Sequence, residues 1–72
     1  MDIKLKIGKR IKELRLLAGY SQMELSGLSN LDRTYITSVE NGKRNISIEN
    51  IKNITDALNI TLKDFFDDQK FN

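Results

Sequence analysis

This sequence contains no cysteine, no histidine and no proline, and it has only four glycines. Without cysteine it has neither a disulfide nor a thiolate metal ligand, and without histidine it lacks the commonest general base and metal ligand. No linker, collagen-like repeat or low-complexity tract is visible, because such segments need proline or glycine in quantity. We therefore expect no metal, no cofactor and no small-molecule ligand, and an enzyme is the least favoured class of protein.

Long apolar runs are also missing. No stretch approaches the ~20 residues that a helix needs to cross a bilayer, and the first residues lack the apolar block of a signal peptide. A chain of 72 residues forms one domain at most. Its core is small, so close packing or oligomerisation must stabilise it. The sequence predicts a cytoplasmic protein that does not associate with membranes.

Neither sign of charge is in large excess, but the charges are unevenly distributed. Twelve basic residues stand against ten acidic ones, which leaves a net charge of +2. The first helical segment concentrates cations, namely Lys4, Lys6, Lys9, Arg10, Lys12 and Arg15. The last residues are acidic, and we interpret Asp67 and Asp68 as a solvated tail. A basic face is typical of proteins that bind polyanions, although an ordinary solvated helix produces the same pattern.

Helical periodicity dominates the first third of the chain. The first helix is predicted to end before Gly19, which favours the left-handed conformation that follows a helix. Its apolar stripe consists of Ile3, Ile7, Ile11, Leu14 and Leu17. A second helix follows from Ser21, which forms a capping box with Glu24 three residues later. That helix runs to about Leu28, and its spacing points Leu25 and Leu28 inward.

A tight turn over residues 29–31 separates this helix from a third. Asn30 is expected at positive φ, because asparagine tolerates the left-handed region better than any residue except glycine. Asp32 caps the third helix and Gly42 ends it. Its apolar side is predicted to consist of Tyr35, Ile36 and Val39.

Two more helices complete the chain. Ser47 caps the fourth, whose apolar stripe consists of Ile48, Ile51, Ile54 and Leu58. Thr61 with Asp64 starts a short final helix that contains Leu62, Phe65 and Phe66. No stretch alternates with period two, so the sequence predicts an all-α protein, a compact five-helix bundle. Because each helix is too short to be stable alone, tertiary burial must hold the bundle together.

Several short motifs carry a family resemblance that spans nearly the whole chain. They are Leu14-Arg15 before Gly19, Ser21-Gln22, Glu24-Leu25, and Ile36 followed by Glu40, Gly42 and Arg44. With them the chain resembles the helix-turn-helix domain of phage-repressor-like regulators, also called the Cro/repressor or xenobiotic-response-element type, which has the lambda-repressor-like fold. The resemblance implies one domain over residues 1–72, with a helix-turn-helix unit at about 21–41 and a dimerising helix at about 61–67.

A narrower resemblance comes from the run 30–36 and from Arg44-Asn45-Ile46-Ser47. These segments are similar to the controller proteins of restriction–modification systems, small dimeric regulators that time expression of the endonuclease and of themselves. The resemblance implies a sequence-specific transcriptional regulator in the cytoplasm of a bacterium or a phage-infected cell. Its partners would be a second copy of the chain and a pseudo-palindromic operator in double-stranded DNA.

The motif assigns candidate DNA contacts to the turn, the third helix and the loop after it. The residues expected to read bases are Arg33, Thr34, Thr37 and Ser38, because residues at the start of a recognition helix reach base edges. The residues expected to hold phosphates are Gln22, Tyr35, Asn41, Lys43, Arg44, Asn45 and Ser47. For the charged members the alternative is a solvated surface, and Tyr35 either packs on the core or lies on the DNA backbone.

Two further roles are structural. In the family, the pair equivalent to Arg15 and Glu40 is a partly buried salt bridge that ties the first helix to the third, and we expect the same here. The expected dimer interface consists of Ile60, Leu62, Phe65 and Phe66. Of the two phenylalanines, we expect one to fill the core and the other to be exposed in the monomer.

Other interpretations remain open at this point. The chain also fits a phage-type repressor or an antitoxin-like regulator, which bind DNA in a different biological setting. A protein-interaction module would instead need an apolar, exposed third helix, which the polar residues there disfavour. One departure from the family pattern is Ser26-Gly27, where a glycine within the second helix costs about 1 kcal/mol relative to alanine.

Overall fold

The computed structural model describes residues 2–72, and over that range every regular element is helical. The elements are α1 (Ile3–Leu17), α2 (Gln22–Ser29), α3 (Arg33–Glu40), α4 (Ile48–Leu58), α5 (Leu62–Phe66) and a 3-10 helix, η1 (Gln69–Phe71). The predicted all-α five-helix fold is confirmed, while η1 was not predicted. None of these helices has both the length and the apolar character needed to cross a bilayer.

Side-chain caps fix where four of the helices begin. The oxygens of Ser21, Asp32, Ser47 and Thr61 each accept a hydrogen bond from a backbone N–H in the first turn of the helix that follows. At α2 the cap is reciprocal, because the backbone N–H of Ser21 also donates to the carboxylate of Glu24 at 2.9 Å. All four predicted caps are confirmed, and they satisfy N–H groups that a helix start otherwise leaves unpaired.

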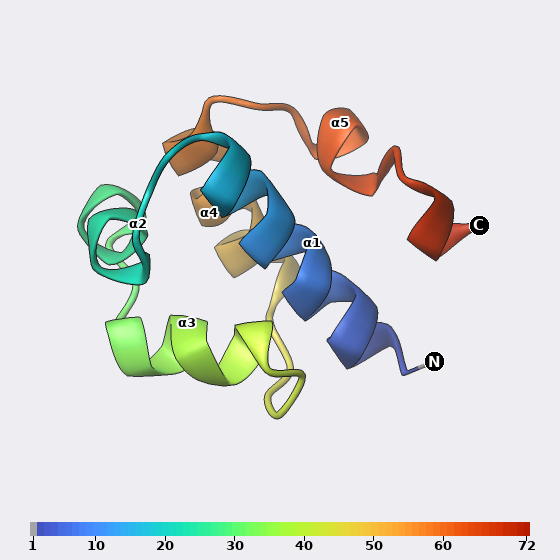
Figure 1. Cartoon of the computed structure of the whole chain (residues 1–72), viewed down its shortest axis with the longest axis horizontal. Coiled ribbons are helices and arrows are strands. Elements are labelled where there is room, and N and C mark those ends of the chain that lie inside the picture. Colours follow the sequence, from blue (N-terminus) through green and yellow to red (C-terminus); the bar gives the residue numbers. More distant parts are fainter. Residues whose placement is uncertain (1) are drawn as a thin grey trace.

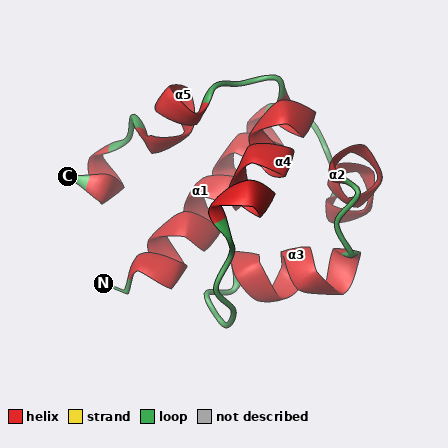
Figure 2. Cartoon of the chain, turned by 180° about the vertical axis from the view of Figure 1, so that it is seen from behind, coloured by secondary structure: helices red, strands yellow, loops and turns green. Residues whose placement is uncertain are grey.

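The helices pack into one bundle, in which α1 crosses the middle of the view (Figure 1). α1 contacts α3 and α4, α2 contacts α3 and α4, and α5 contacts α4. The views in Figures 1 and 2 agree that α2 and α3 lie at one end of the molecule and α5 at the other. The helix-turn-helix unit and the last helix therefore present separate surfaces.

The core lies where these helices meet. Its most deeply buried side chains are Ile11, Leu25, Ile36, Val39, Ile54, Thr55 and Phe65. Gly8 lets α1 approach the end of α3, because a Cβ there would lie 2.8 Å from the carbonyl oxygen of Glu40 and closer still to that of Val39. This contact sets the distance between the first helix and the recognition helix.

Three residues predicted for the apolar stripes lie outside the core. Ile3, Leu17 and Ile48 are the first or last residues of their helices, and Leu17 is 78% exposed. The prediction that they belong to the buried stripes is therefore wrong. The buried face of α1 is centred on Ile7, Gly8, Ile11 and Arg15, and that of α4 begins at Ile51.

Leu28 was also predicted to point inward, and that prediction is wrong, because its side chain is 54% exposed. The buried positions of α2 are Leu25 and Ser29, four residues apart, which places the centre of the buried face between them. Leu28 falls to one side of that face.

The C-terminal segment is bound to α1. Asp67 is exposed, as predicted, whereas Asp68 is half-buried and paired with Lys70, so the segment as a whole is not a solvated tail. Arg10 donates to the backbone carbonyls of Phe65 and Asp64 at 2.7 and 2.8 Å. Lys70 donates to Asp68 at 2.8 Å and lies 3.4 Å from Glu13 of α1. Long-range ion pairs of this kind leave no local sequence signature, so the sequence could not predict them.

Candidate nucleic-acid interface

The α2–turn–α3 unit owes its shape to a few local interactions. Asn30 has φ = 60°, the predicted left-handed conformation, and ends α2. The hydroxyl of Ser26 donates to the carbonyl of Leu31 at 2.5 Å, which closes the turn from the α2 side. Asp32 then caps α3 through the N–H of Thr34 at 2.7 Å. The turn fixes the angle between the two helices before any partner is present.

One face of α3 belongs to the core and the other is open. Ile36 and Val39 are buried, whereas Arg33 and Thr34 at the helix start are exposed and Ser38 is half-buried. The open face therefore presents a guanidinium and two hydroxyl groups, which can donate to or accept from base edges. This placement is the one that the base-reading prediction requires for these three residues.

The ion pair expected between α1 and α3 is present. The guanidinium of Arg15 donates to both carboxylate oxygens of Glu40, at 2.8 and 2.9 Å, and a third hydrogen bond reaches the carbonyl of Tyr20 at 2.9 Å. Both side chains are buried. The hydrogen bond to Glu40 is the main cause that raises the pKa of Arg15, so this guanidinium stays charged. It ties the loop after α1 to the end of the recognition helix.

Gln22 and Thr37 interact with this ion pair and with each other. The Gln22 amide nitrogen donates to Glu40 Oε1 at 3.1 Å, and the Thr37 hydroxyl donates to the Gln22 amide oxygen at 2.7 Å. From the sequence, Gln22 is predicted to bind phosphate and Thr37 to read a base, and the contact between them is not predicted. Their separation of 15 residues is set by the turn, so only the folded structure reveals it.

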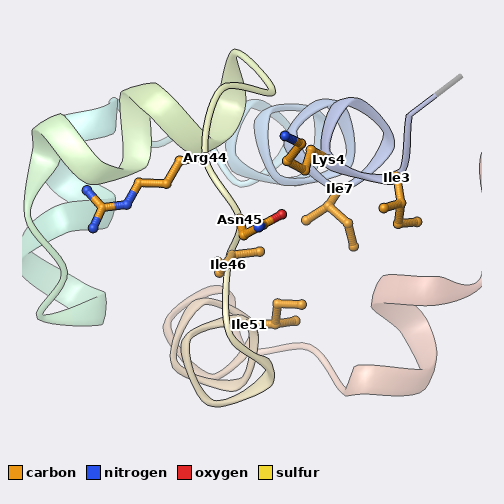
Figure 3. A pocket seen from close by; sticks show the side chains of 7 residues that line it. All are labelled: Ile3, Lys4, Ile7, Arg44, Asn45, Ile46 and Ile51. Atoms are coloured by element: carbon orange, nitrogen blue, oxygen red, sulfur yellow. The ribbon is translucent and has the colours of Figure 1, made fainter.

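The loop after α3 packs on the core through one apolar side chain, and its polar side chains are exposed. Ile46 lies beside Ile7 and Ile51 around an apolar cavity of about 150 Å³ between α1, the loop and α4 (Figure 3). In the same view the side chain of Arg44 extends away from this cavity. The partly buried Ile46 anchors the loop.

The polar residues of this loop face outward. Asn41, Lys43, Arg44 and Asn45 are exposed, as phosphate contacts must be, and so is Ser47. The Ser47 hydroxyl also accepts the backbone N–H of Asn50 at 3.1 Å as the cap of α4, so any phosphate contact must share that oxygen.

Tyr35 lies at the junction of α3, this loop and α4. Its ring is half-buried, and the Arg44 guanidinium stacks over it at 4.9 Å from the ring centre. The Asn50 amide donates to the Tyr35 hydroxyl at 3.1 Å, which leaves the hydroxyl proton free to be donated elsewhere. The ring packs against the core, as one of the two alternatives for Tyr35 requires, while a contact of its hydroxyl with the DNA backbone stays a prediction. Tyr35 also lines a shallow depression that includes Thr34 and Arg44.

Asn50 is a functional candidate that was not predicted from the sequence. It lies in the first turn of α4, beyond the loop after α3. The only available signal was its position three residues after a capping serine, close to a basic loop.

Among residues 2–72 no three acidic side chains are arranged to hold a metal ion.

Not every cation of the predicted basic face is available to a partner. Arg10 and Arg15 are engaged in internal contacts, with Glu13, Asp68 and Glu40 as their acidic partners. Lys9 and Lys12 on α1 are exposed. The cations nearest the open face of α3 are Arg33 itself and the loop residues Lys43 and Arg44.

The fold and this site define a helix-turn-helix protein, and comparison with known proteins agrees. Residues 11–65 match a protein family described as helix-turn-helix. The control protein C.MunI from a Mycoplasma species is 44% identical over 68 residues, which cover 93% of this chain and 92% of that protein.

Solved structures lead to the same group. The restriction–modification controller protein C.AhdI from Aeromonas hydrophila has 44% identity and a TM-score of 0.84, covering 88% of this chain and 96% of that one. The C.Esp1396I tetramer, solved in complex with its natural 35 base-pair operator, has 36% identity and a TM-score of 0.86, covering 92% and 87%. C.Esp1396I has also been solved with single substitutions of an arginine, a threonine and a tyrosine at three consecutive positions. The chain belongs to the helix-turn-helix family, and within it to the restriction–modification control proteins.

Proposed function

We propose that this protein is the controller of a restriction–modification system, a regulator that binds a pseudo-palindromic operator as a homodimer in the cytoplasm. The observation that carries the proposal is the open face of α3, where Arg33 and Thr34 stand exposed beside a cationic loop. A chain with 44% identity to a control protein over nearly its whole length supports the biological setting.

In the proposed complex α3 enters the major groove. The first residues of a recognition helix reach the base edges, and these are Arg33 and Thr34. Arginine can bind the O6 and N7 atoms of guanine with two hydrogen bonds, and the threonine methyl can contact a thymine methyl. Ser38 lies one turn later on the same helix, where a short side chain lets the helix approach the groove closely.

Phosphate contacts frame the recognition helix on both sides. α2 lies over the DNA backbone with Gln22 at its start, and the loop after α3 contributes Asn41, Lys43, Asn45 and Ser47. Between them lies Tyr35, whose hydroxyl proton is available because Asn50 donates to its oxygen. Arg44, stacked on the Tyr35 ring, brings a positive charge to the same depression. These residues fix the orientation of the protein and carry no sequence information.

The dimer surface is proposed at the opposite end, around α5. Phe65 is fully buried within one chain and so is removed from the interface predicted from the sequence. Phe66 is 37% exposed and packs edge-on against Phe65 and Phe71. Ile60 and Leu62 are half-buried beside it. A two-fold axis at this end would place two copies of α3 about 34–36 Å apart, on successive turns of one DNA face.

Selection of bound sites from a random DNA pool tests the function directly. We expect the wild-type protein to enrich two inverted half-sites whose centres lie about one helical turn apart. The matched control is the Arg33→Ala protein, which should retain DNA by its phosphate contacts while losing enrichment of the guanine that Arg33 reads. A wild-type pool without any enriched sequence would contradict the proposed function.

A further inference from the structure

A continuous chain of hydrogen bonds runs from the buried ion pair to the backbone of the recognition helix. Arg15 holds Glu40, Glu40 accepts from Gln22, and Gln22 accepts from Thr37. The Thr37 hydroxyl also lies 3.0 Å from the carbonyl oxygen of Arg33, one turn earlier on α3. The chain thus joins α1, α2 and α3 through side chains.

The chemistry of this chain allows Gln22 only one orientation. The carboxylate of Glu40 can only accept hydrogen bonds, so the Gln22 amide must turn its nitrogen toward it. The amide oxygen then faces Thr37 at 2.7 Å, and the hydroxyl there must be the donor. The orientation follows from which groups can donate and which can accept.

Two consequences follow for the outer surface. The single hydroxyl proton of Thr37 is directed to acceptors within the protein, Gln22 and the Arg33 carbonyl, so Thr37 does not offer it to a base. The Gln22 amide nitrogen carries two hydrogens, and Glu40 takes one. The second is left for a partner at the start of α2, where a helix N-terminus attracts phosphate.

We infer that Thr37 is a positioning residue, which fixes the Gln22 amide in its phosphate-binding orientation and does not read a base. This inference rests on the proposed function and replaces the role that the sequence suggested for Thr37. Holding the glutamine before DNA arrives removes the entropy cost of ordering that side chain on binding. Thr37 therefore contributes to affinity for every DNA sequence and leaves base preference unchanged.

The first test is a set of titrations of operator and unrelated duplex DNA, monitored by fluorescence anisotropy. The variants are Thr37→Val, which loses the hydroxyl, Thr37→Ser, which keeps it, Gln22→Ala, and Gln22→Ala combined with Thr37→Val. Thr37→Val should weaken binding to both duplexes by the same factor, about two- to tenfold, the value of one hydrogen bond. Thr37→Ser should restore most of the affinity.

The double variant separates positioning from direct contact. If Thr37 acts through Gln22, the double variant binds no more weakly than Gln22→Ala alone. The inference would be overturned if the affinity losses of the two single variants multiply in the double variant. A change in the bases that Thr37→Val prefers would overturn it as well. If Thr37→Val does not fold, Thr37→Ala removes the same donor with a better helix former and takes its place.

A measurement without DNA keeps the inference separate from the proposed function. In wild-type protein the two side-chain amide protons of Gln22, assigned by their loss in Gln22→Ala, should have NMR shifts that differ from those of a solvated glutamine. In Thr37→Val they should move toward the solvated positions, and in Thr37→Ser they should return. Unchanged shifts in Thr37→Val would refute the positioning role even if operator binding is normal. Failure of the wild-type protein to select any operator would instead refute the proposed function.

Discussion

The four arginines of this chain lie in four different environments, and each environment sets a different role. Arg10 holds backbone carbonyls of the C-terminal segment, and Arg15 pairs with a buried glutamate. Arg44 stacks on a tyrosine ring, and Arg33 stands exposed at the start of α3. From the sequence all four contribute alike to a basic face. Only their surroundings show that two of them are engaged in contacts within the fold and two are exposed.

Arg33 gives the first prediction at this scale. Arg33→Ala should reduce the preference for operator over unrelated duplex by about tenfold or more, because two hydrogen bonds to a guanine are lost. The thermal midpoint should stay unchanged, since the side chain is exposed. A gel-shift titration against both duplexes measures the ratio. Equal ratios for the variant and the wild type would exclude Arg33 as a base reader.

The buried ion pair between Arg15 and Glu40 leads to a second prediction. Glu40→Ala should destabilise the protein by about 3 kcal/mol, because it leaves the Arg15 guanidinium buried without a partner. For a domain of this size the thermal midpoint should fall by more than about 10 °C. The matched control is Asp56→Ala, which removes an exposed pair with Lys52 and should change stability by less than about 1 kcal/mol. Similar losses in the two variants would contradict the role assigned to the buried pair.

For the helices, the sequence predicts interactions between neighbouring residues, but it does not predict contacts between residues far apart in the chain. The caps at Ser21, Asp32, Ser47 and Thr61 and the left-handed Asn30 follow from side chains within three residues of each helix end, so the sequence predicts them. The contacts of Arg10 with the last helix span more than 50 residues. The Gln22–Thr37 contact likewise depends on how the turn orients two helices, which no local pattern encodes.

α2 offers a prediction about helix stability. Gly27 lies within α2, and a Cβ placed there would meet nothing within 4 Å. Gly27→Ala should therefore stabilise the protein by about 0.5–1 kcal/mol through helix propensity alone. Gly8→Ala is the contrasting variant, because its Cβ would collide with the backbone of α3 and should destabilise. Urea unfolding of both variants tests the pair, and a loss of stability in Gly27→Ala would show that α2 needs a glycine there.

The C-terminal segment should respond to pH. The hydrogen bond from Lys70 is the main cause that lowers the pKa of Asp68 below 3.8, and the hydrogen bond from Arg10 lowers that of Glu13 below 4.5. A carboxylate with a lowered pKa contributes fully to the stability of the docked segment when the pH is above its ordinary pKa. That contribution disappears as the pH falls through the lowered pKa. The pKa of Lys70 is raised above 10.5, mainly by Asp68, so its contribution is complete below that pH and disappears above it.

NMR shifts of the Phe71 ring should therefore stay constant from about pH 5 to 10 and move toward those of an exposed ring in stronger acid. Lys70→Ala removes the main partner of Asp68 and should bring the acid transition to a higher pH. A Phe71 ring that does not respond to acid would mean that aromatic packing alone holds the segment.

For the whole molecule, the arrangement of the two ends decides how two copies can meet on DNA. The helix-turn-helix unit and α5 lie at opposite ends (Figures 1 and 2), so contacts at α5 leave both recognition helices free. Neither end is complete by itself, because a single α3 reads only one half of a two-fold operator. Dimerisation through α5 would thus convert a small domain with limited contacts into a specific binder.

Substitutions of the two neighbouring phenylalanines of α5 should have different effects, one on dimerisation and the other on folding. Phe66→Ala should weaken dimerisation by about tenfold or more, since the exposed aromatic ring is the largest apolar group on that surface, and it should leave the helical content unchanged. Operator binding should weaken with it, while binding of each monomer to a half-site should persist. Phe65→Ala removes a fully buried ring and should instead destabilise the fold by about 3–5 kcal/mol. Sedimentation equilibrium with circular dichroism distinguishes the two effects. A Phe66→Ala protein with wild-type association would place the dimer contact elsewhere than α5.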